Sequence, residues 1–341
     1  MRAVGIDSHK DTLAVAVVDE VGRQVATTEV ANTPEGFERL AGWLTRHRPE
    51  RVGIEGSGGH GRQVALRLLR AGYEVVDVPP QLTARERRRQ RTPAKSDITD
   101  AVGIARVTLR EAHLPGVRTN GDLEDLRVLV RYRRELVAER TRLASRLHAD
   151  LEQLHPGYQQ RIGRLTTRRN LDRARRLLTG DPQPRAVVAR QRVTQLRQLT
   201  RQITDLTSEI TQRARRLNTS LVTIPGIGDL TAAELLAEIG DISRYRTRAQ
   251  FAMANGTAPI PASSGRTQRY RLNRGGNRRL NRIIHLIALT QISHHPQARV
   301  YYQRKQAEGK TRREAIRSLK RHISDRIYRT LRDTHPHTAL T

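Results

Sequence analysis

The chain has 341 residues, no cysteine and a formal net charge of +29 at pH 7. Disulfides and thiolate metal sites are therefore excluded, and no apolar run approaches the roughly 20 residues that a membrane-spanning helix requires. Charged residues between Asp7 and Asp11 interrupt the first apolar stretch, so we expect no signal peptide, no membrane partner and a cytoplasmic location.

The charge is distributed unevenly along the chain. Residues 1–112 carry 18 Lys/Arg and 15 Asp/Glu, a net of +3, whereas residues 266–331 carry 18 and 3, a net of +15. Of the 63 basic residues only 5 are lysine, a skew typical of a GC-rich genome that does not explain the excess of base over acid. The excess indicates binding to a polyanion such as a nucleic acid.

The first 112 residues alternate between strand and helix patterns. Strands are predicted over about 2–7, 12–19, 23–30, 51–55 and 73–78. Thr33 and Pro34 predict the N-cap and first residue of a helix to about residue 46, and further helices are predicted over 61–71 and from residue 97. The Arg-rich segment 81–96 is expected to be mobile. The order βββαβαβα is that of the ribonuclease H-like fold.

The middle of the chain has leucines at helical spacing. Two helical stretches, 121–157 and 186–217, lie on either side of a Gly/Pro break at 180–184. This pattern predicts two long antiparallel helices or a coiled coil, and a compact bundle without a partner is the alternative. Because the segment is long, helical and poor in independent core, we expect a self-association arm.

The C-terminal part opens with a turn motif. Ile224-Pro225-Gly226-Ile227-Gly228 precedes a helix predicted over 229–239 and is typical of a helix-hairpin-helix element, which holds a phosphate without reading sequence. An ordinary tight turn is the alternative. A Gly/Pro/Ser-rich loop at 255–265 and two basic helices over about 276–293 and 297–331 follow. The predicted fold class is α/β plus all-α, with boundaries at 1–112, 113–217, 218–333 and a tail at 334–341.

Four acidic residues in the N-terminal third form the first candidate site. Asp7 and Glu55 each end a predicted strand, and Asp97 and Asp100 are three apart, so they share one face of a helix. Carboxylates gathered from strand ends and a helix face make a hard oxygen site for Mg²⁺ or Mn²⁺. In a chain this basic, such a site is expected to cut or rejoin a phosphodiester. The alternatives are strand-end, ion-pair and helix-capping roles for the individual residues.

A serine-containing loop is the second candidate. Ser263 and Ser264 follow Ala258-Pro259-Ile260-Pro261-Ala262 and precede Gly265 in an Arg-rich stretch. A nucleophile flanked by phosphate clamps would have this composition. From the loop alone, an ordinary polar loop is the preferred interpretation.

Five sequence blocks occur together in one order. They are Gly5 to Lys10, Ile54 to Gly58, Lys95 to Ala101, Ile224 to Gly228 and Pro259 to Gly265. With these blocks the chain resembles, over nearly its whole length, the IS110/IS1111 family of transposases, the DEDD recombinases of bacterial insertion sequences. Thr257 and Asn281 depart from this pattern, since Leu and Arg are usual there. Arg282 is a possible substitute for the phosphate clamp lost at Asn281.

The resemblance implies an activity and the residues that carry it. It implies a RuvC-like domain with Mg²⁺ (or Mn²⁺) bound by Asp7, Glu55, Asp97 and Asp100, a coiled-coil arm, and a C-terminal transposase domain. Ser264, with Ser263 as second choice, would form a covalent phosphoserine link to DNA near the metal site of a partner subunit. The implied partners are donor and target DNA, a noncoding bridge RNA and further copies of the chain, as a dimer pairing into a tetramer associated with the bacterial nucleoid.

Contacts to nucleic acid are expected from basic residues and glycine turns near these blocks. The expected residues are Lys10, Lys95, Gly226, Gly228, Arg266, Arg269, Arg271, Arg274, Asn277, Arg278, Arg279 and Arg282. Two other functions fit the sequence less well. One is a RuvC-like Holliday-junction endonuclease that uses metal-activated water, and the other is a non-catalytic nucleic-acid-binding protein.

Overall fold

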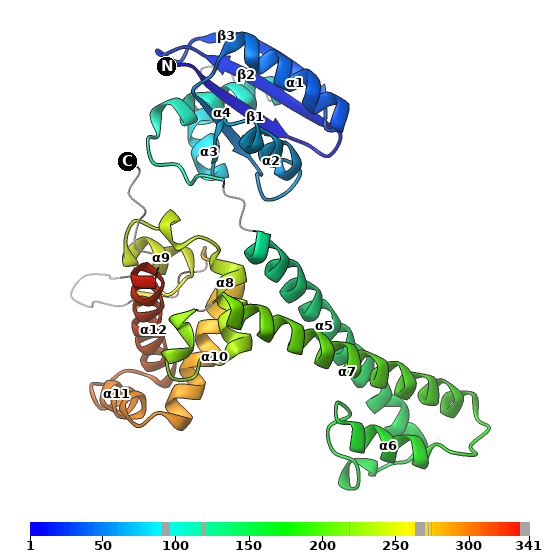
Figure 1. The fold of residues 1–341 in the computed structure, drawn as a ribbon. Coiled ribbons are helices and arrows are strands. Elements are labelled where there is room, and N and C mark those ends of the chain that lie inside the picture. Colours follow the sequence, from blue (N-terminus) through cyan, green and yellow to red (C-terminus); the bar gives the residue numbers. More distant parts are fainter. Residues whose placement is uncertain are drawn as a thin grey trace. The chain divides into compact units, whose positions relative to one another are not determined.

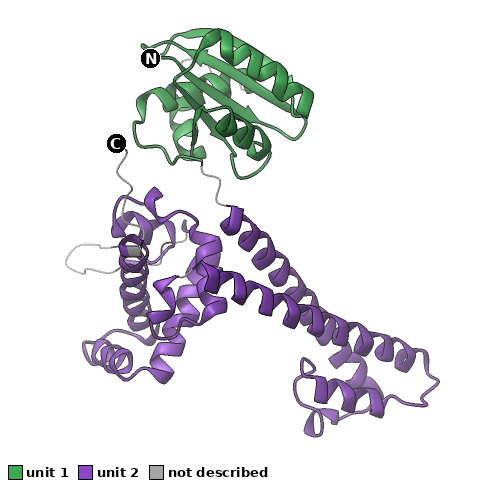
Figure 2. Cartoon of the chain, in the orientation of Figure 1, with its two compact units in different colours: residues 1–120 green, residues 121–341 purple. Residues whose placement is uncertain are grey.

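The structure is a computed structural model that describes residues 1–89, 96–117, 121–217, 219–262, 270–271, 273 and 275–334. The chain divides into two compact units, residues 1–120 (unit 1) and 121–341 (unit 2), shown in different colours in Figure 2. None of the described helices combines the length and the apolar character needed to cross a membrane.

Unit 1 contains a five-stranded sheet in the order β3-β2-β1-β4-β5 (Figure 1). The strands are β1 (Ala3–Ser8), β2 (Thr12–Val18), β3 (Gln24–Ala31), β4 (Arg51–Glu55) and β5 (Glu74–Asp77). β1, β2 and β3 pair antiparallel, whereas β4 is parallel to both β1 and β5. This is the sheet expected for a ribonuclease H-like fold, so the sequence-based topology is confirmed.

Helices cover both faces of this sheet. They are α1 (Pro34–His47), α2 (Arg62–Arg70), α3 (Pro80–Arg89) and α4 (Asp97–Arg110). Alternate residues of β1 point to opposite faces, so Val4 and Ile6 join the core under α1 and α2, while Ala3 joins the core under α4. The predicted cap of α1 is present, since the Thr33 side chain accepts a hydrogen bond from the backbone N–H of Gly36.

Small residues let α4 lie directly on the sheet. A Cβ added at Gly5 would lie 2.2 Å from the carbonyl oxygen of Ala101, and one added at Gly53 would lie 1.8 Å from Oγ1 of Thr108. The far end of α4 is tied to the sheet by Arg51, which is buried and donates to the carbonyl oxygen of Glu111 at 2.8 Å. These contacts fix the distance of α4 from the sheet and the direction of this helix, which begins at Asp97.

The segment expected to be mobile is in part a helix. Residues 80–89 form α3, so the expectation is wrong there, and residues 90–95 lie outside the described part of the chain. α3 is stabilised by contacts with α4, because Thr83 and Glu86 are buried and Arg110 of α4 donates to Glu86 at 2.8 Å. These contacts are tertiary, and no apolar period in the sequence reveals them.

Unit 2 begins with a hairpin of two long helices. α5 (Gly121–Leu154) and α7 (Pro184–Arg216) pack along each other, with Leu136, Leu199 and Ile203 buried between them. The two predicted long helices are therefore present. A short helix that was not predicted, α6 (Arg168–Leu177), lies near the end of the hairpin farthest from α8 to α12 (Figure 1).

The far end of the hairpin has a core of its own. Leu147 and Leu151 of α5, Leu171 of α6 and Leu196 of α7 are all fully buried in one cluster, joined by Tyr158 from a short 3-10 segment, Tyr158–Gln160. The expectation that this region is poor in independent core is therefore wrong. Self-association of the arm stays a prediction.

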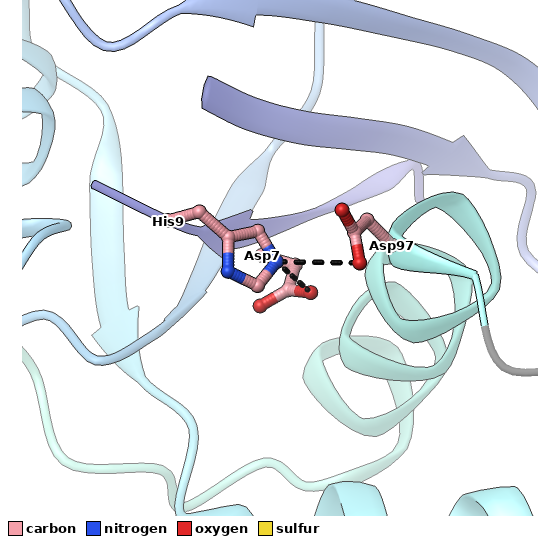
Figure 3. A group of neighbouring side chains, drawn as sticks. All are labelled: Asp7, His9 and Asp97. Carbon is pink, nitrogen blue, oxygen red and sulfur yellow. Dashed lines mark ion pairs between the residues drawn. The ribbon is translucent and has the colours of Figure 1, made fainter. Parts of the chain in front are cut away.

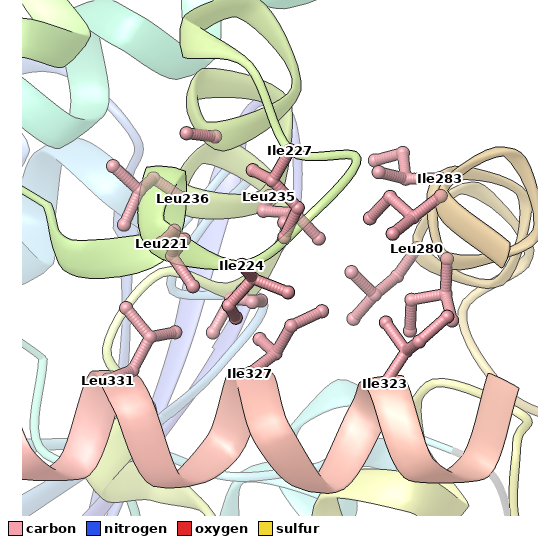
Figure 4. Packing of buried hydrophobic residues seen from close by; sticks show 14 of the residues in the cluster. Leu221, Ile224, Ile227, Leu235, Leu236, Leu280, Ile283, Ile323, Ile327 and Leu331 are labelled. Carbon is pink, nitrogen blue, oxygen red and sulfur yellow. The ribbon is translucent and has the colours of Figure 1, made fainter. Parts of the chain in front are cut away.

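The rest of unit 2 is a helical bundle around one apolar core (Figure 4). Its helices are α8 (Asp229–Ile239), α9 (Arg248–Ala254), α10 (Arg278–His294), α11 (Pro296–Ala307) and α12 (Arg312–Thr334), with 3-10 segments at Ser220–Thr223 and Ile242–Arg244 and a strand pair β6 (Ile260–Pro261) and β7 (Tyr270–Arg271). The single helix predicted over 297–331 is wrong. Two helices are present, separated by a turn at Gly309 with φ of 86°.

Candidate metal-dependent active site

Asp7 and Glu55 are neighbours at one end of two parallel strands. In the pairing of β1 with β4, Asp7 is opposite Glu55, and the Ser8 hydroxyl donates to the Glu55 carbonyl oxygen at 2.8 Å. Both strands end here because the apolar runs that build the sheet stop at these carboxylates. The sequence-based expectation that strand ends bring the two acids together is confirmed.

Asp97 and Asp100 lie in the first turn of α4. Ser96 caps the helix by accepting a hydrogen bond from the backbone N–H of Thr99 at 3.1 Å. The Asp97 side chain is about half exposed, whereas Asp100 is buried against the sheet. The close contact between Gly5 and α4 brings this helix turn beside the end of β1.

A histidine that the sequence analysis did not select lies between the two elements. His9 Nε2 is 3.2 Å from Asp7 Oδ2 and 3.4 Å from Asp97 Oδ1 (Figure 3). Ligand atoms of Asp7, His9 and Asp97 all lie within 4.8 Å of one another. The sequence offered a weak signal, because His9 is only two residues after Asp7, directly beyond the end of β1.

The carboxylates influence one another electrostatically. Burial raises the pKa of the Asp7 carboxyl, His9 opposes the rise, and the charges of Asp100 and Asp97 add to it. Burial also raises the pKa of Glu55, with a smaller opposing effect from the Thr83 hydroxyl and a further rise from Asp7 and Asp100. Each of the four acids thus lies close enough to affect another, so the structure brings the predicted set to one place.

The site fits a divalent cation. Oδ1 of Asp100 is buried with no hydrogen-bond partner among the described residues, although Arg87 Nε lies 3.4 Å away as an ion-pair partner. Repulsion among neighbouring carboxylates is unfavourable, and a bound cation offsets it. Oxygen ligands from Asp and Glu are those that Mg²⁺ and Mn²⁺ prefer. Asp7, Glu55, Asp97 and Asp100 are therefore the residues that could hold such an ion.

α3 contributes the other groups that sequence reasoning missed. Arg87 faces Asp100, and buried Thr83 lies near Glu55. Both residues belong to the segment that was expected to be mobile, which is why neither was considered.

The proposed nucleophile and several of the expected nucleic-acid contacts belong to segments that the structure does not describe. Ser263, Ser264, Lys95, Arg266, Arg269 and Arg274 all lie outside the described residues. Among the other residues expected to contact nucleic acid, Lys10, Arg271, Arg278 and Arg282 are exposed.

Two of the expected contacts also have partners within unit 2. Asn277 is the N-cap of α10, accepting from the backbone N–H groups of Arg279 and Leu280, and it donates to Glu238 at 3.2 Å. Arg279 NH1 is 3.9 Å from the same glutamate. Asn277 and Arg279 therefore both contribute to the packing of α10 against α8.

The predicted phosphate-binding turn has a defined shape. Gly226 has φ of 82°. The carbonyl oxygen of the preceding residue, Pro225, accepts a hydrogen bond from the Gln291 side chain of α10 at 2.6 Å. Gly228 is the N-cap of α8 and makes no side-chain capping hydrogen bond. Asp229 follows in the first turn and pairs with Arg215 at 2.6 Å. The helix-hairpin-helix assignment stays a prediction, since a carboxylate already occupies this helix start.

The sheet order together with acids at the ends of β1 and β4 defines a ribonuclease H-like class of protein. A transposase profile of the DEDD type found in IS110 matches residues 4–156, and the profile of the transposase IS116/IS110/IS902 family matches residues 218–303. The chain belongs to this family of transposases, enzymes that cut and rejoin DNA.

Relatives from insertion elements cover most of the chain. A protein of insertion element IS110 from Streptomyces coelicolor is 30% identical over 289 residues, which is 70% of this chain and 71% of the relative. A protein of IS116 from Streptomyces clavuligerus is 27% identical and covers 97% of this chain and 94% of its own length. The putative transposase of the IS117 mini-circle from Streptomyces coelicolor is also 27% identical, covering 92% and 90%.

Two solved structures of RuvC match part of the chain. RuvC from T. thermophilus, in complex with a Holliday junction substrate, is 20% identical, with a TM-score of 0.28, and covers 34% of this chain and 99% of its own. A second RuvC structure from Thermus thermophilus gives a TM-score of 0.27.

Proposed function

We propose that this transposase cuts and rejoins DNA with a Mg²⁺ (or Mn²⁺) site formed by Asp7, Glu55, Asp97 and Asp100 and with Ser264 as the nucleophile. The observation that carries the proposal is the convergence of acids from β1, β4 and α4. One of them, Asp100, has a buried oxygen without a hydrogen-bond partner in the described part of the chain. When bound, a divalent cation neutralises charge on the scissile phosphate and polarises its oxygens.

Residues of the chain itself prepare the site for that ion. Asp7 and Glu55 are held by the paired strands, and Asp97 and Asp100 are held by a capped helix that packs directly on Gly5. Arg87 beside Asp100 supplies a positive charge on the same side of the sheet. This positioning fixes the ligands in advance, so little reorganisation is needed when DNA binds.

Ser264 would attack the phosphorus atom of the scissile phosphodiester. Its oxygen forms a bond to phosphorus as the bond between phosphorus and one deoxyribose oxygen breaks, and the leaving oxygen takes a proton. The resulting phosphoserine ester keeps the bond energy, so a deoxyribose hydroxyl of another strand can displace the serine without ATP. Strand exchange between donor and target DNA follows from this reversibility.

The proposed partners follow from the resemblance and from the charge of unit 2. A noncoding bridge RNA would pair with donor and target DNA and supply the choice of sequence. The basic residues would hold nucleic-acid backbones, with a salt-dependent affinity. A dimer that pairs into a tetramer would place the serine of one copy near the acids of another.

Trapping a covalent protein–DNA adduct tests the nucleophile. Wild type should form the adduct with a supercoiled donor in Mg²⁺, Ser264→Ala should form none while still binding nucleic acid, and Ser263→Ala should retain most activity. Adduct formation by Ser264→Ala would contradict the assignment. Cleavage without any adduct would favour metal-activated water, and full cleavage by Asp7→Ala would reject a catalytic role for the acids.

A further inference from the structure

The end of the arm carries a dense positive charge that the proposed active site does not use. We define the arm tip as residues 155–192, which contain 10 Arg and 2 Asp, a net of +8. Helix α5, residues 121–154, forms the neighbouring shaft and contains 7 Arg and 7 Asp/Glu, a net of zero. The positive charge of the tip is therefore a local feature and does not follow from arginine-rich composition alone.

The acids of the tip are already occupied. Asp172 pairs with Arg197 of α7, and Asp181 accepts a hydrogen bond from the backbone N–H of Gln183 at 2.9 Å. Just beyond the tip, buried Asp150 pairs with Arg185 and Arg192. These pairs leave a second set of arginines without a carboxylate partner among the described residues, namely Arg168, Arg169, Arg175 and Arg176.

These four arginines lie on one exposed side of α6. Leu171 and Ala174 of the same helix are fully buried in the core of the tip, whereas all four arginines are exposed. Arg168 and Arg175 are seven residues apart, as are Arg169 and Arg176, so each pair shares a face. Two helical turns separate the members of a pair by about 10.5 Å, close to the roughly 12 Å width of the DNA major groove.

The position of two of these charges is unfavourable without an external anion. Arg168 and Arg169 occupy the first turn of α6, where the helix dipole is positive and where no acidic residue is present. The helix is nevertheless well anchored, because Thr167 caps it and the core of the tip fixes its inner face. Both observations indicate a rigid surface that is prepared for anions, so little conformational entropy is lost on binding.

We propose that the four exposed arginines of α6 bind the phosphodiester backbone of a nucleic-acid duplex. This inference rests on the nucleic-acid partner of the proposed function, and it assigns the arm tip a role separate from self-association. Two copies of the same +8 surface repel each other, whereas a duplex carries regularly spaced phosphates that arginine recognises well.

The test compares two full-length variants that lose the same number of charges. The tip variant replaces Arg168, Arg169, Arg175 and Arg176 with Gln. The control replaces four exposed arginines of the two long helices with Gln, Arg131, Arg142 and Arg146 of α5 and Arg201 of α7. Affinity for a DNA duplex and for an RNA duplex is measured from low to moderate salt in EDTA, so that no cleavage occurs. Melting temperature and sedimentation are measured in parallel.

The tip variant should reduce the slope of log K against log salt by about 2–4, since each lost phosphate contact removes roughly 0.9. The control should change the slope by less than about 1. If the tip variant loses affinity for one duplex and not for the other, the affected duplex is the nucleic acid that the arm tip binds. Equal losses in both variants, or an altered oligomeric state with an unchanged slope, would overturn the proposal. Because cleavage is absent, failure here is distinguishable from failure of the serine mechanism.

Discussion

Units 1 and 2 differ in their net charge and in where their charged residues lie. Unit 1 contains 19 Lys/Arg and 15 Asp/Glu, and it gathers its key acids by close packing of a helix on a sheet. Unit 2 contains 44 Lys/Arg and 19 Asp/Glu, and its excess positive charge lies on exposed helix faces. Binding a polyanion requires positive charge, whereas binding a divalent cation for cleavage of that polyanion requires negative charge. The charge is divided accordingly, with a net of +4 in unit 1 and +25 in unit 2.

The largest expected effect tests whether the two units are stabilised independently. Ile54 is fully buried in the core of unit 1, and Ile327 is fully buried in the core of unit 2. Each substitution to Ala should lower the free energy of unfolding of its own unit by about 2–5 kcal/mol, because it leaves a cavity. Calorimetry should show that each variant shifts one transition. A shared shift of both transitions would show that the units unfold together.

The next largest effect concerns the packing that places the acids. In Gly5→Ala the new Cβ would lie 2.2 Å from the Ala101 carbonyl oxygen and 2.3 Å from the Ala105 nitrogen, so α4 must move. We expect a loss of about 1–3 kcal/mol in stability together with loss of DNA cleavage. Chemical denaturation and a cleavage assay measure the two effects.

A matched glycine provides the control for this change. Gly42 lies inside α1, and a Cβ there meets none of the described atoms within 4 Å. Gly42→Ala should therefore stabilise unit 1 by about 0.5–1 kcal/mol and leave cleavage unchanged. Comparable losses in both variants would mean that the contact between Gly5 and α4 does not govern the site.

These contacts also explain what could be predicted from the sequence. The ends of the strands at Asp7 and Glu55 were predictable, because apolar runs define strands and parallel neighbours end at the same edge. Asp97 and Asp100 were predictable from their spacing after Ser96. The distance between α4 and the sheet was not predictable. It depends on the contact of Gly5 with the backbone of Ala101, which is 96 positions further along the chain.

Other elements were missed because their stability is tertiary. α3 has Leu82 as the apolar residue that packs on its neighbours, and its buried residues Thr83 and Glu86 are polar. The apolar period of α6 is weak, because its two buried residues, Leu171 and Ala174, lie among five arginines. The break at Gly309 was overlooked because basic residues continue on both sides.

The smallest expected effect is a pH dependence of the stability of unit 1. Burial raises the pKa of Asp7 in the folded state, so the native protein binds this proton more readily than the unfolded chain does. Without metal, stability should therefore fall as pH rises from about 4 through the raised pKa, and Asp7→Asn should flatten this dependence. Denaturation in EDTA at several pH values measures it. An identical slope in wild type and Asp7→Asn would contradict the assigned burial effect.

Binding of Mn²⁺, followed by electron paramagnetic resonance, tests the central claim most directly. The account predicts that wild type binds the ion and that Asp7→Asn, Glu55→Gln, Asp97→Asn and Asp100→Asn each weaken binding by about tenfold or more, equivalent to about 1.4 kcal/mol. Glu38→Gln, a change at an exposed residue of α1, should have no effect. No binding by wild type, or equal binding by all four variants, would contradict the claim that these acids form one cation site.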